Sequence, residues 1–176
     1  MDKIMKIFAL VSTILLILFV VLFYSFNYNI FYVLAITSGT TAYHFTMRLF
    51  VGYSINYFFD NKVNYNRKWF KVSDFEMKLY QILKVKKWKA KMPTYAPETF
   101  DLTKHSLDEI LMTMCQAEMV HEIIIVLSFV PLIAIFWFGS PLAFIITSVL
   151  SALFDLMFVI MQRFNRNRIL RLKLKL

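Results

Sequence analysis

Residues 7–47 read IFALVSTILLILFVVLFYSFNYNIFYVLAITSGTTAYHFTM, and none of these 41 residues, which lie between Lys6 and Arg48, is Asp, Glu, Lys or Arg. A single helix of this length would be roughly twice as long as the ~30 Å hydrocarbon core of a bilayer is thick. The run therefore predicts two membrane-spanning helices. We expect the turn between them at residues 24–29, YSFNYN, because asparagines favour turns and tyrosines suit the headgroup layer. The predicted spans are residues 5–26 and 30–51.

A second uncharged run lies between Glu122 and Asp155 and is interrupted by Gly139, Ser140 and Pro141, which have the chemistry of a tight connection. This run predicts two further spans, at residues 120–138 and 141–162. The composition agrees, because 59% of the residues are hydrophobic and the mean hydropathy is +0.60. We therefore predict an all-α fold, an integral membrane four-helix bundle that forms a single domain over residues 1–176.

The charges predict the orientation of this bundle. The net charge is +9, yet the connections at 24–29 and 138–141 contain no Lys or Arg. By the positive-inside rule these connections face outward. Both termini, the middle section at about 56–118 and the basic tail at 163–176 are then cytoplasmic, as in a multi-pass plasma-membrane protein. The first apolar run is too long for a signal peptide, so we expect it to be an uncleaved anchor.

The middle section is basic, rich in aromatic residues and expected to be partly helical. Lys87, Trp88 and Lys89 show the interleaving of rings and ammonium groups that suits a bilayer surface, where membrane lipids are the partner. The alternative is a phosphate site for an acyl-CoA or a similar anionic cosubstrate. No nucleic-acid partner is expected, because the segment lacks any recognised binding module.

A capping box, Ser106 with Glu109, predicts a helix that begins near residue 107. We expect this helix to continue to Phe138 with a kink at Pro131. Cys115 is the single cysteine, so the sequence gives no disulfide and no metal-ligand set.

Ionisable side chains inside predicted spans cost free energy and are functional candidates by default. These intramembrane polar residues are His44, Arg48 and Asp155. His44 and Asp155 are expected at similar depth, so we predict that Asp155 pairs with His44 or Arg48. The alternatives are that Arg48 reaches the cytoplasmic interface and that His44 bonds a neighbouring helix.

Glu118 and His121 lie three residues apart where the polar middle section meets the third span. On a helix this spacing places both on one face. Our hypothesis is that the pair is half of an active site at the cytoplasmic surface. At the end of the fourth span, asparagines among arginines supply hydrogen bonds as well as charge for a carbonyl or phosphate. The residues there are Gln162, Arg163, Asn165 and Arg166.

Several of these short motifs together resemble the glycosyl-4,4'-diaponeurosporenoate acyltransferases, small bacterial membrane enzymes that esterify a sugar hydroxyl of a carotenoid glycoside. The resemblance runs from about residue 75 to the C-terminus and does not include the first two spans. Its motifs are Phe75-Glu76, Lys87-Trp88-Lys89, Ala117-Glu118 with His121, and Gln162-Arg163-Phe164-Asn165-Arg166 with Arg168.

The resemblance implies an enzyme that transfers a fatty acyl group to a hydroxyl of a lipid or glycolipid acceptor. His121 is then the expected general base, Glu118 orients its ring, and Glu122 is a possible substitute for Glu118. Arg163, Asn165 and Arg166 bind the donor or polarise its carbonyl. No bound cofactor is expected, and an acyl-CoA or other acyl thioester is the cosubstrate.

Two other classes remain open. The chain could be a non-enzymatic lipid-binding or accessory membrane protein, in which Glu118, His121 and the arginines form an ion-pair network between helices. It could also be a transporter that uses His44, Arg48 and Asp155 as a polar path, although four spans without an internal repeat make a small one. The acceptor and the oligomeric state are left open by the sequence.

Overall fold

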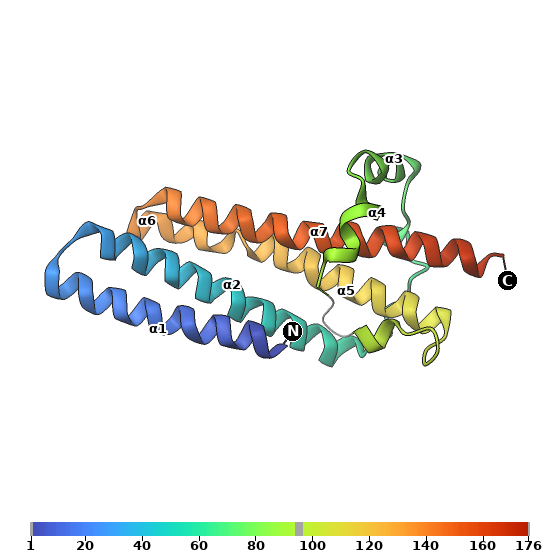
Figure 1. Cartoon of the computed structure of the whole chain (residues 1–176), viewed down its shortest axis with the longest axis horizontal. Coiled ribbons are helices and arrows are strands. Elements are labelled where there is room, and N and C mark those ends of the chain that lie inside the picture. The colour runs from blue at the N-terminus through green and yellow to red at the C-terminus, as the bar shows by residue number, and fades with distance from the viewer. Residues whose placement is uncertain (1, 94–96, 176) are drawn as a thin grey trace. The chain divides into compact units, whose positions relative to one another are not determined.

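The protein is described by a computed structural model that covers residues 2–93 and 97–175. Within these residues the regular structure is helical and no strand occurs, so the all-α prediction is confirmed (Figure 1). The α-helices are α1 (Asp2–Phe26), α2 (Asn29–Phe59), α3 (Asp74–Ile82), α4 (Val85–Trp88), α5 (Leu107–Leu127), α6 (Ile135–Phe138) and α7 (Pro141–Lys173).

The chain divides into two compact units. The apolar unit contains Asp2–Val51 and Ile123–Phe154, and the polar unit contains Gly52–Glu122 and Asp155–Leu176. The boundaries fall inside α2, α5 and α7, so each of these helices contributes to both units. Each unit is described separately below.

Both predicted turns of the apolar unit are found. Asn27 lies between α1 and α2 with a φ of 53°, a left-handed conformation that asparagine tolerates better than most residues. Gly139 and Ser140 separate α6 from α7 with φ values of 62° and 49°. The Tyr32 hydroxyl donates to the Phe138 carbonyl oxygen at 2.7 Å. These turns let the apolar segments run back and forth, and Figure 1 shows α1 and α2 as antiparallel neighbours.

Polar side chains inside the apolar unit bond to one another. The Arg48 guanidinium donates to the Ser151 hydroxyl at 2.8 Å, and this hydroxyl lies 2.9 Å from that of Ser128. The Tyr43 hydroxyl donates to the Leu127 carbonyl at 3.0 Å. Hydrogen bonding of this kind lowers the free-energy cost of keeping an arginine among apolar helices.

The expected helix from residue 107 to Phe138 is interrupted. Its start is confirmed, because the Ser106 amide donates to Glu109 Oε2 at 2.7 Å and the Glu109 amide donates to Ser106 Oγ at 3.3 Å. However, α5 ends at Leu127, and a 3₁₀ segment over Val130–Ala134 precedes α6. Pro131 has no N–H to donate and its ring clashes with the preceding turn, so it breaks the helix where a kink was expected.

Three helical segments of the described chain are long and apolar enough to cross a membrane: Lys3–Phe26, Leu107–Phe138 and Pro141–Lys173. The 31-residue α2 is not among them. Threonines, serines and His44 in its middle lower its hydropathy. The protein is therefore a helical protein of the membrane class, while the fourth span and the cytoplasmic termini stay predictions.

The polar unit has two small hydrophobic clusters that join its short elements. One contains Tyr80 of α3, Val85 of α4 and Phe164 of α7. The other contains Val63, Phe70 and Cys115. In this way α3 and α4 are packed on the C-terminal half of α7 and the preceding loop is packed on α5, which brings distant parts of the sequence to one place.

Candidate functional site

Glu118 is a fully buried carboxylate of α5 that is neutralised by two arginines of α7. Its Oε1 accepts a hydrogen bond from Arg163 Nη1 at 2.6 Å, and its Oε2 accepts one from Arg166 Nη1. Neither Glu118 nor Arg166 exposes any side-chain surface. A buried charge is tolerated only when it is paired in this way.

Several other donors of the two arginines bond to Glu76 and to backbone carbonyl oxygens. Arg163 Nε donates to Glu76 Oε1 at 2.8 Å, and its Nη groups donate to the carbonyl oxygens of Trp69 and Lys71. Arg166 donates to the Phe70 carbonyl. We call Glu76, Glu118, Arg163 and Arg166 the Glu118 cluster. It holds α3 and the 69–71 loop against α5 and α7.

Glu76 is also the second half of a capping box at the start of α3. Its carboxylate accepts a hydrogen bond from the Ser73 amide at 2.8 Å, while the Ser73 hydroxyl accepts one from the Glu76 amide at 3.2 Å. Partial burial alone would raise the pKa of Glu76, but the hydrogen bonds from Ser73 and Arg163 outweigh it and hold this pKa below its ordinary value. Glu76 is therefore charged at neutral pH.

His121 is held by a different carboxylate. Its Nδ1 lies 2.8 Å from Asp155 Oδ1, and its ring stacks on Phe158 with centroids 4.5 Å apart and an angle of 9°. Asp155 is 1% exposed, whereas the His121 side chain is 22% exposed. Asp155 thus fixes one ring nitrogen while the ring keeps an accessible edge.

This geometry corrects the role expected of Glu118. The carboxylate that orients His121 is Asp155, because both oxygens of Glu118 are taken by arginines. The candidate substitute, Glu122, accepts a hydrogen bond from Trp69 Nε1 at 2.8 Å instead. Residues three apart on one helix share a face, but their partners on other elements decide what each one does.

The other predicted partners of Asp155 lie in the apolar unit. His44 is a buried residue of α2, and one partner of Arg48 is Ser151. The predicted pairing of Asp155 with His44 or Arg48 stays a prediction. Among the described residues there is no group of three His, Cys, Asp or Glu side chains that could hold a metal ion.

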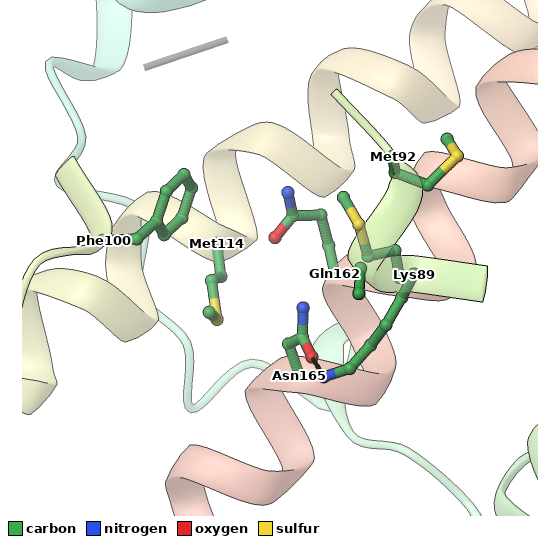
Figure 2. Close-up of a pocket in the computed structure, with 8 residues that line it drawn as sticks. Lys89, Met92, Phe100, Met114, Gln162 and Asn165 are labelled. Carbon is green, nitrogen blue, oxygen red and sulfur yellow. Dashed lines mark hydrogen bonds between the residues drawn. The ribbon is translucent and has the colours of Figure 1, made fainter. Parts of the chain in front are cut away.

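A pocket of about 350 Å³ lies within the polar unit, between the 89–92 segment, α5 and α7. Figure 2 shows Lys89 and Asn165 at one side of it, where the Lys89 ammonium donates to Asn165 Oδ1, with Gln162 close by. Its lining residues are Lys89, Ala90, Met92, Phe100, Met114, Met161, Gln162 and Asn165.

The pocket collects only some of the expected substrate-binding residues. Lys89, Gln162 and Asn165 line it. Lys87 is exposed and does not line it, and Trp88 Nε1 donates to the Leu83 carbonyl at 3.0 Å. Arg163 and Arg166 serve the Glu118 cluster instead, as described above.

Two features escaped sequence reasoning. The capping box of α3 was readable in Ser73-Asp74-Phe75-Glu76, which has the same spacing as the box at Ser106. The pocket had no such signal, because its residues come from four separate segments and meet only after folding.

Taken together, the chain is an all-helical protein of the membrane class with a buried arginine and glutamate cluster and a histidine oriented by an aspartate. The model of the glycosyl-4,4'-diaponeurosporenoate acyltransferase family matches residues 66–174, and the chain belongs to this family. The matched region contains the Glu118 cluster, His121, Asp155 and the pocket, whereas α1 and α2 precede it. Searches of curated proteins and of solved structures returned no match. The suspected family is confirmed.

Proposed function

We propose that this protein transfers a fatty acyl group from a thioester donor to a hydroxyl of a lipid or glycolipid acceptor, with His121 as the general base. The family description supports acyl transfer to a carotenoid glycoside. The observation that carries the proposal is the contact of His121 Nδ1 with Asp155 at 2.8 Å. When Nδ1–H donates to this carboxylate, Nε2 is the unprotonated nitrogen that can accept a proton.

The proposed step conserves atoms and charge. Nε2 of His121 takes the proton of the acceptor hydroxyl as the oxygen attacks the thioester carbonyl carbon. A carbon–oxygen bond forms, and the carbon–sulfur bond then breaks. The leaving thiolate takes the proton back from the imidazolium, so the products are an ester and a free thiol. Asp155 stabilises the imidazolium between these two transfers.

The contacts change the roles proposed for the polar residues of α7. Arg163 and Arg166 are committed to Glu118, so the proposal assigns them to structure rather than to the donor. Gln162, Asn165 and Lys89 take the substrate-binding role because they line the pocket. The donor is an acyl-CoA or a similar thioester, and no tightly bound cofactor is required.

The membrane arrangement is part of the same proposal. The three apolar helices support a multi-pass protein of the bacterial plasma membrane. We propose that α2 crosses as a fourth span beside them, with its polar face against other helices, and that both termini are cytoplasmic. A lipid-soluble acceptor would then reach His121 from the membrane and the donor from the cytoplasm.

Substitution of His121 by Gln tests the proposal in purified protein reconstituted in nanodiscs. Labelled acyl-CoA and a glycosylated carotenoid or another glycolipid are supplied, and the ester is measured. We expect the rate to fall by about 10²–10⁴-fold, the usual contribution of a general base, with the thermal unfolding midpoint nearly unchanged. His105→Gln is the matched control, because His105 is the other histidine of the polar unit and its side chain is 39% exposed.

A second function is favoured by the Glu118 cluster itself. Its buried ion pairs are what a non-enzymatic lipid-binding or accessory protein needs to hold its helices together. If the unsubstituted protein forms no ester with any glycolipid acceptor, the acyltransferase proposal is wrong and this second function is favoured. If His121→Gln retains the full rate of ester formation, His121 is not the general base.

A further inference from the structure

Lys89 is a cation of the pocket for which the described residues provide no carboxylate partner. Its ammonium donates to the neutral amide of Asn165 and lies 5.0 Å from the centre of the Phe164 ring. Three other lysines each pair with an aspartate: Lys62 with Asp60, Lys104 with Asp101 and Lys173 with Asp108. The positive charge of Lys89 is thus available to pair with an anionic ligand.

Neighbouring positive charges add to the positive charge of Lys89. Burial lowers the pKa of Lys89, and the positive charges of Arg168 and Lys86 lower it further. Lys89 is partly buried, whereas Lys86 and Arg168 are exposed, and a group of cations of this kind raises the local concentration of anions. The polar end of the pocket is therefore suited to a phosphate.

The rest of the pocket is suited to a flexible, weakly polar chain. Met92, Met114, Met161 and Phe100 supply thioether and aromatic surface, and Gln162 adds an amide. Methionine side chains adapt to irregular ligands. A volume of about 350 Å³ lies at the small end of the range for small-molecule sites, so it suits an arm of a larger molecule.

The pocket and the candidate base are aligned along the same two helices. On α7, Gln162 follows Asp155 by seven residues, and on α5, Met114 precedes His121 by seven residues. Seven residues make two helical turns, so each pair shares a helix face with a separation of about 10 Å. The pocket and His121 therefore lie along the same faces of α5 and α7.

We propose that the pocket binds the phosphorylated arm of the acyl donor, with a phosphate on Lys89, the amides of the arm on Asn165 and Gln162, and the thioester directed toward His121. The inference rests on the proposed function, because it names the part of the donor that the site recognises. It commits to a phosphopantetheine-type thioester such as acyl-CoA.

Coenzyme A itself is the probe, because it has the phosphorylated arm and no acyl group to react. It is titrated by isothermal calorimetry into the full-length protein in phosphatidylcholine nanodiscs. We expect Lys89→Met to weaken binding at least about tenfold, the effect of losing one charge-assisted hydrogen bond. Lys91→Met is the matched control, because Lys91 is an exposed lysine of the same short 3₁₀ helix, Lys89–Lys91, and does not line the pocket. We expect it to bind within about twofold of the parent.

Two further arms separate the sources of phosphate. Inorganic phosphate and nanodiscs that contain phosphatidylglycerol are each tested as competitors of coenzyme A. The proposal requires that both compete weakly. If inorganic phosphate binds as tightly as coenzyme A, the pocket is a simple anion site. If phosphatidylglycerol displaces coenzyme A in a way that depends on Lys89, the pocket is a lipid-headgroup site. Either result overturns the proposal.

The experiment also separates this inference from the proposed function. Binding of coenzyme A requires no turnover, so Lys89-dependent binding by a protein that forms no ester would support the pocket and contradict the acyltransferase. Conversely, His121-dependent transfer with an unchanged donor KM in Lys89→Met would leave the enzyme proposal standing and overturn the pocket. Thermal unfolding of Lys89→Met shows that the variant is folded, and Lys89→Arg, which keeps the charge, should restore most of the affinity.

Discussion

Two ionisable side chains of α5 have opposite surroundings although they are close in the sequence. Glu118 is fully buried, and both of its oxygens are bonded to arginines. His121, three residues later, has one nitrogen bonded to Asp155 and keeps 22% of its side chain exposed. Both oxygens of Glu118 accept hydrogen bonds from the protein, whereas the contact of His121 with Asp155 uses only Nδ1 of the ring.

The difference comes from α7 rather than from α5. Arg163 and Arg166, near the C-terminal end of α7, reach Glu118, whereas Asp155, two turns earlier, reaches His121. Glu118 and His121 of α5 are therefore distinguished by the partners that α7 places against them. We propose that the closed cluster stabilises the fold and that the open pair performs acid–base chemistry, so substitutions should separate the two by the property that each one changes.

The largest effect is expected from Glu118→Gln. The variant leaves Arg163 and Arg166 without their shared counter-charge in a buried place, and removal of one partner of a buried ion pair costs about 3–5 kcal/mol. We expect a large loss of thermal stability in detergent and a low yield of folded protein. Differential scanning fluorimetry of the purified variant measures it.

Glu122→Gln is the control for this first prediction. Glu122 lies one turn further along α5 and is partly exposed, with one hydrogen bond from Trp69. Its substitution should change the unfolding midpoint little. Equal stability of Glu118→Gln and the parent would show that the Glu118 cluster does not hold the polar unit together.

Asp155→Asn should act on the rate and not on the fold. The asparagine keeps the shape of the side chain and can still accept from His121, but it no longer stabilises the imidazolium. We expect kcat for acyl transfer to fall about 10²–10³-fold, with the KM values for donor and acceptor and the unfolding midpoint nearly unchanged. Steady-state kinetics in nanodiscs separate kcat from KM.

Asp74→Asn provides the comparison, because it makes the same chemical change at an exposed position of α3. A loss of folded protein in Asp155→Asn, with the remaining folded fraction fully active, would make Asp155 a structural residue. The contrast between the closed cluster and the open pair would then be wrong.

Local rules accounted for much of the fold. The turns at Asn27 and at Gly139 with Ser140, and the start of α5 at the Ser106 capping box, follow from short-range chemistry that the sequence contains. The family followed from the order of several motifs. Such features depend on neighbours along the chain, which is why they could be predicted from one sequence.

Features that depend on distant partners could not be predicted in the same way. Two carboxylates are candidates for contact with His121: Glu118 on the same face of α5, and Asp155 on α7. Only the packing of α5 on α7 decides which one contacts the imidazole. The arginines looked like ligands for a substrate because their carboxylate partners lie 45 or more residues away. The periodicity of a single helix predicts neither the partner of His121 nor the partners of the arginines.

The smallest effect is expected at the partly exposed edge of the Glu118 cluster, and it depends on pH. The pKa of Glu76 in the folded protein lies below its ordinary value of 4.5, so its contribution to stability is present above the unfolded pKa and is lost as the pH falls through the folded pKa. Glu76→Gln should therefore cost about 1 kcal/mol at pH 7, and the difference from the parent should shrink as the pH falls below 4.5. Thermal unfolding of both proteins across this range measures it, with the exposed Glu98→Gln as a control that should show little difference at any pH. A loss of stability of the same size at every pH would mean that Glu76 acts through its shape or its neutral hydrogen bonds. The charges that stabilise the cluster would then be those of Glu118, Arg163 and Arg166 alone.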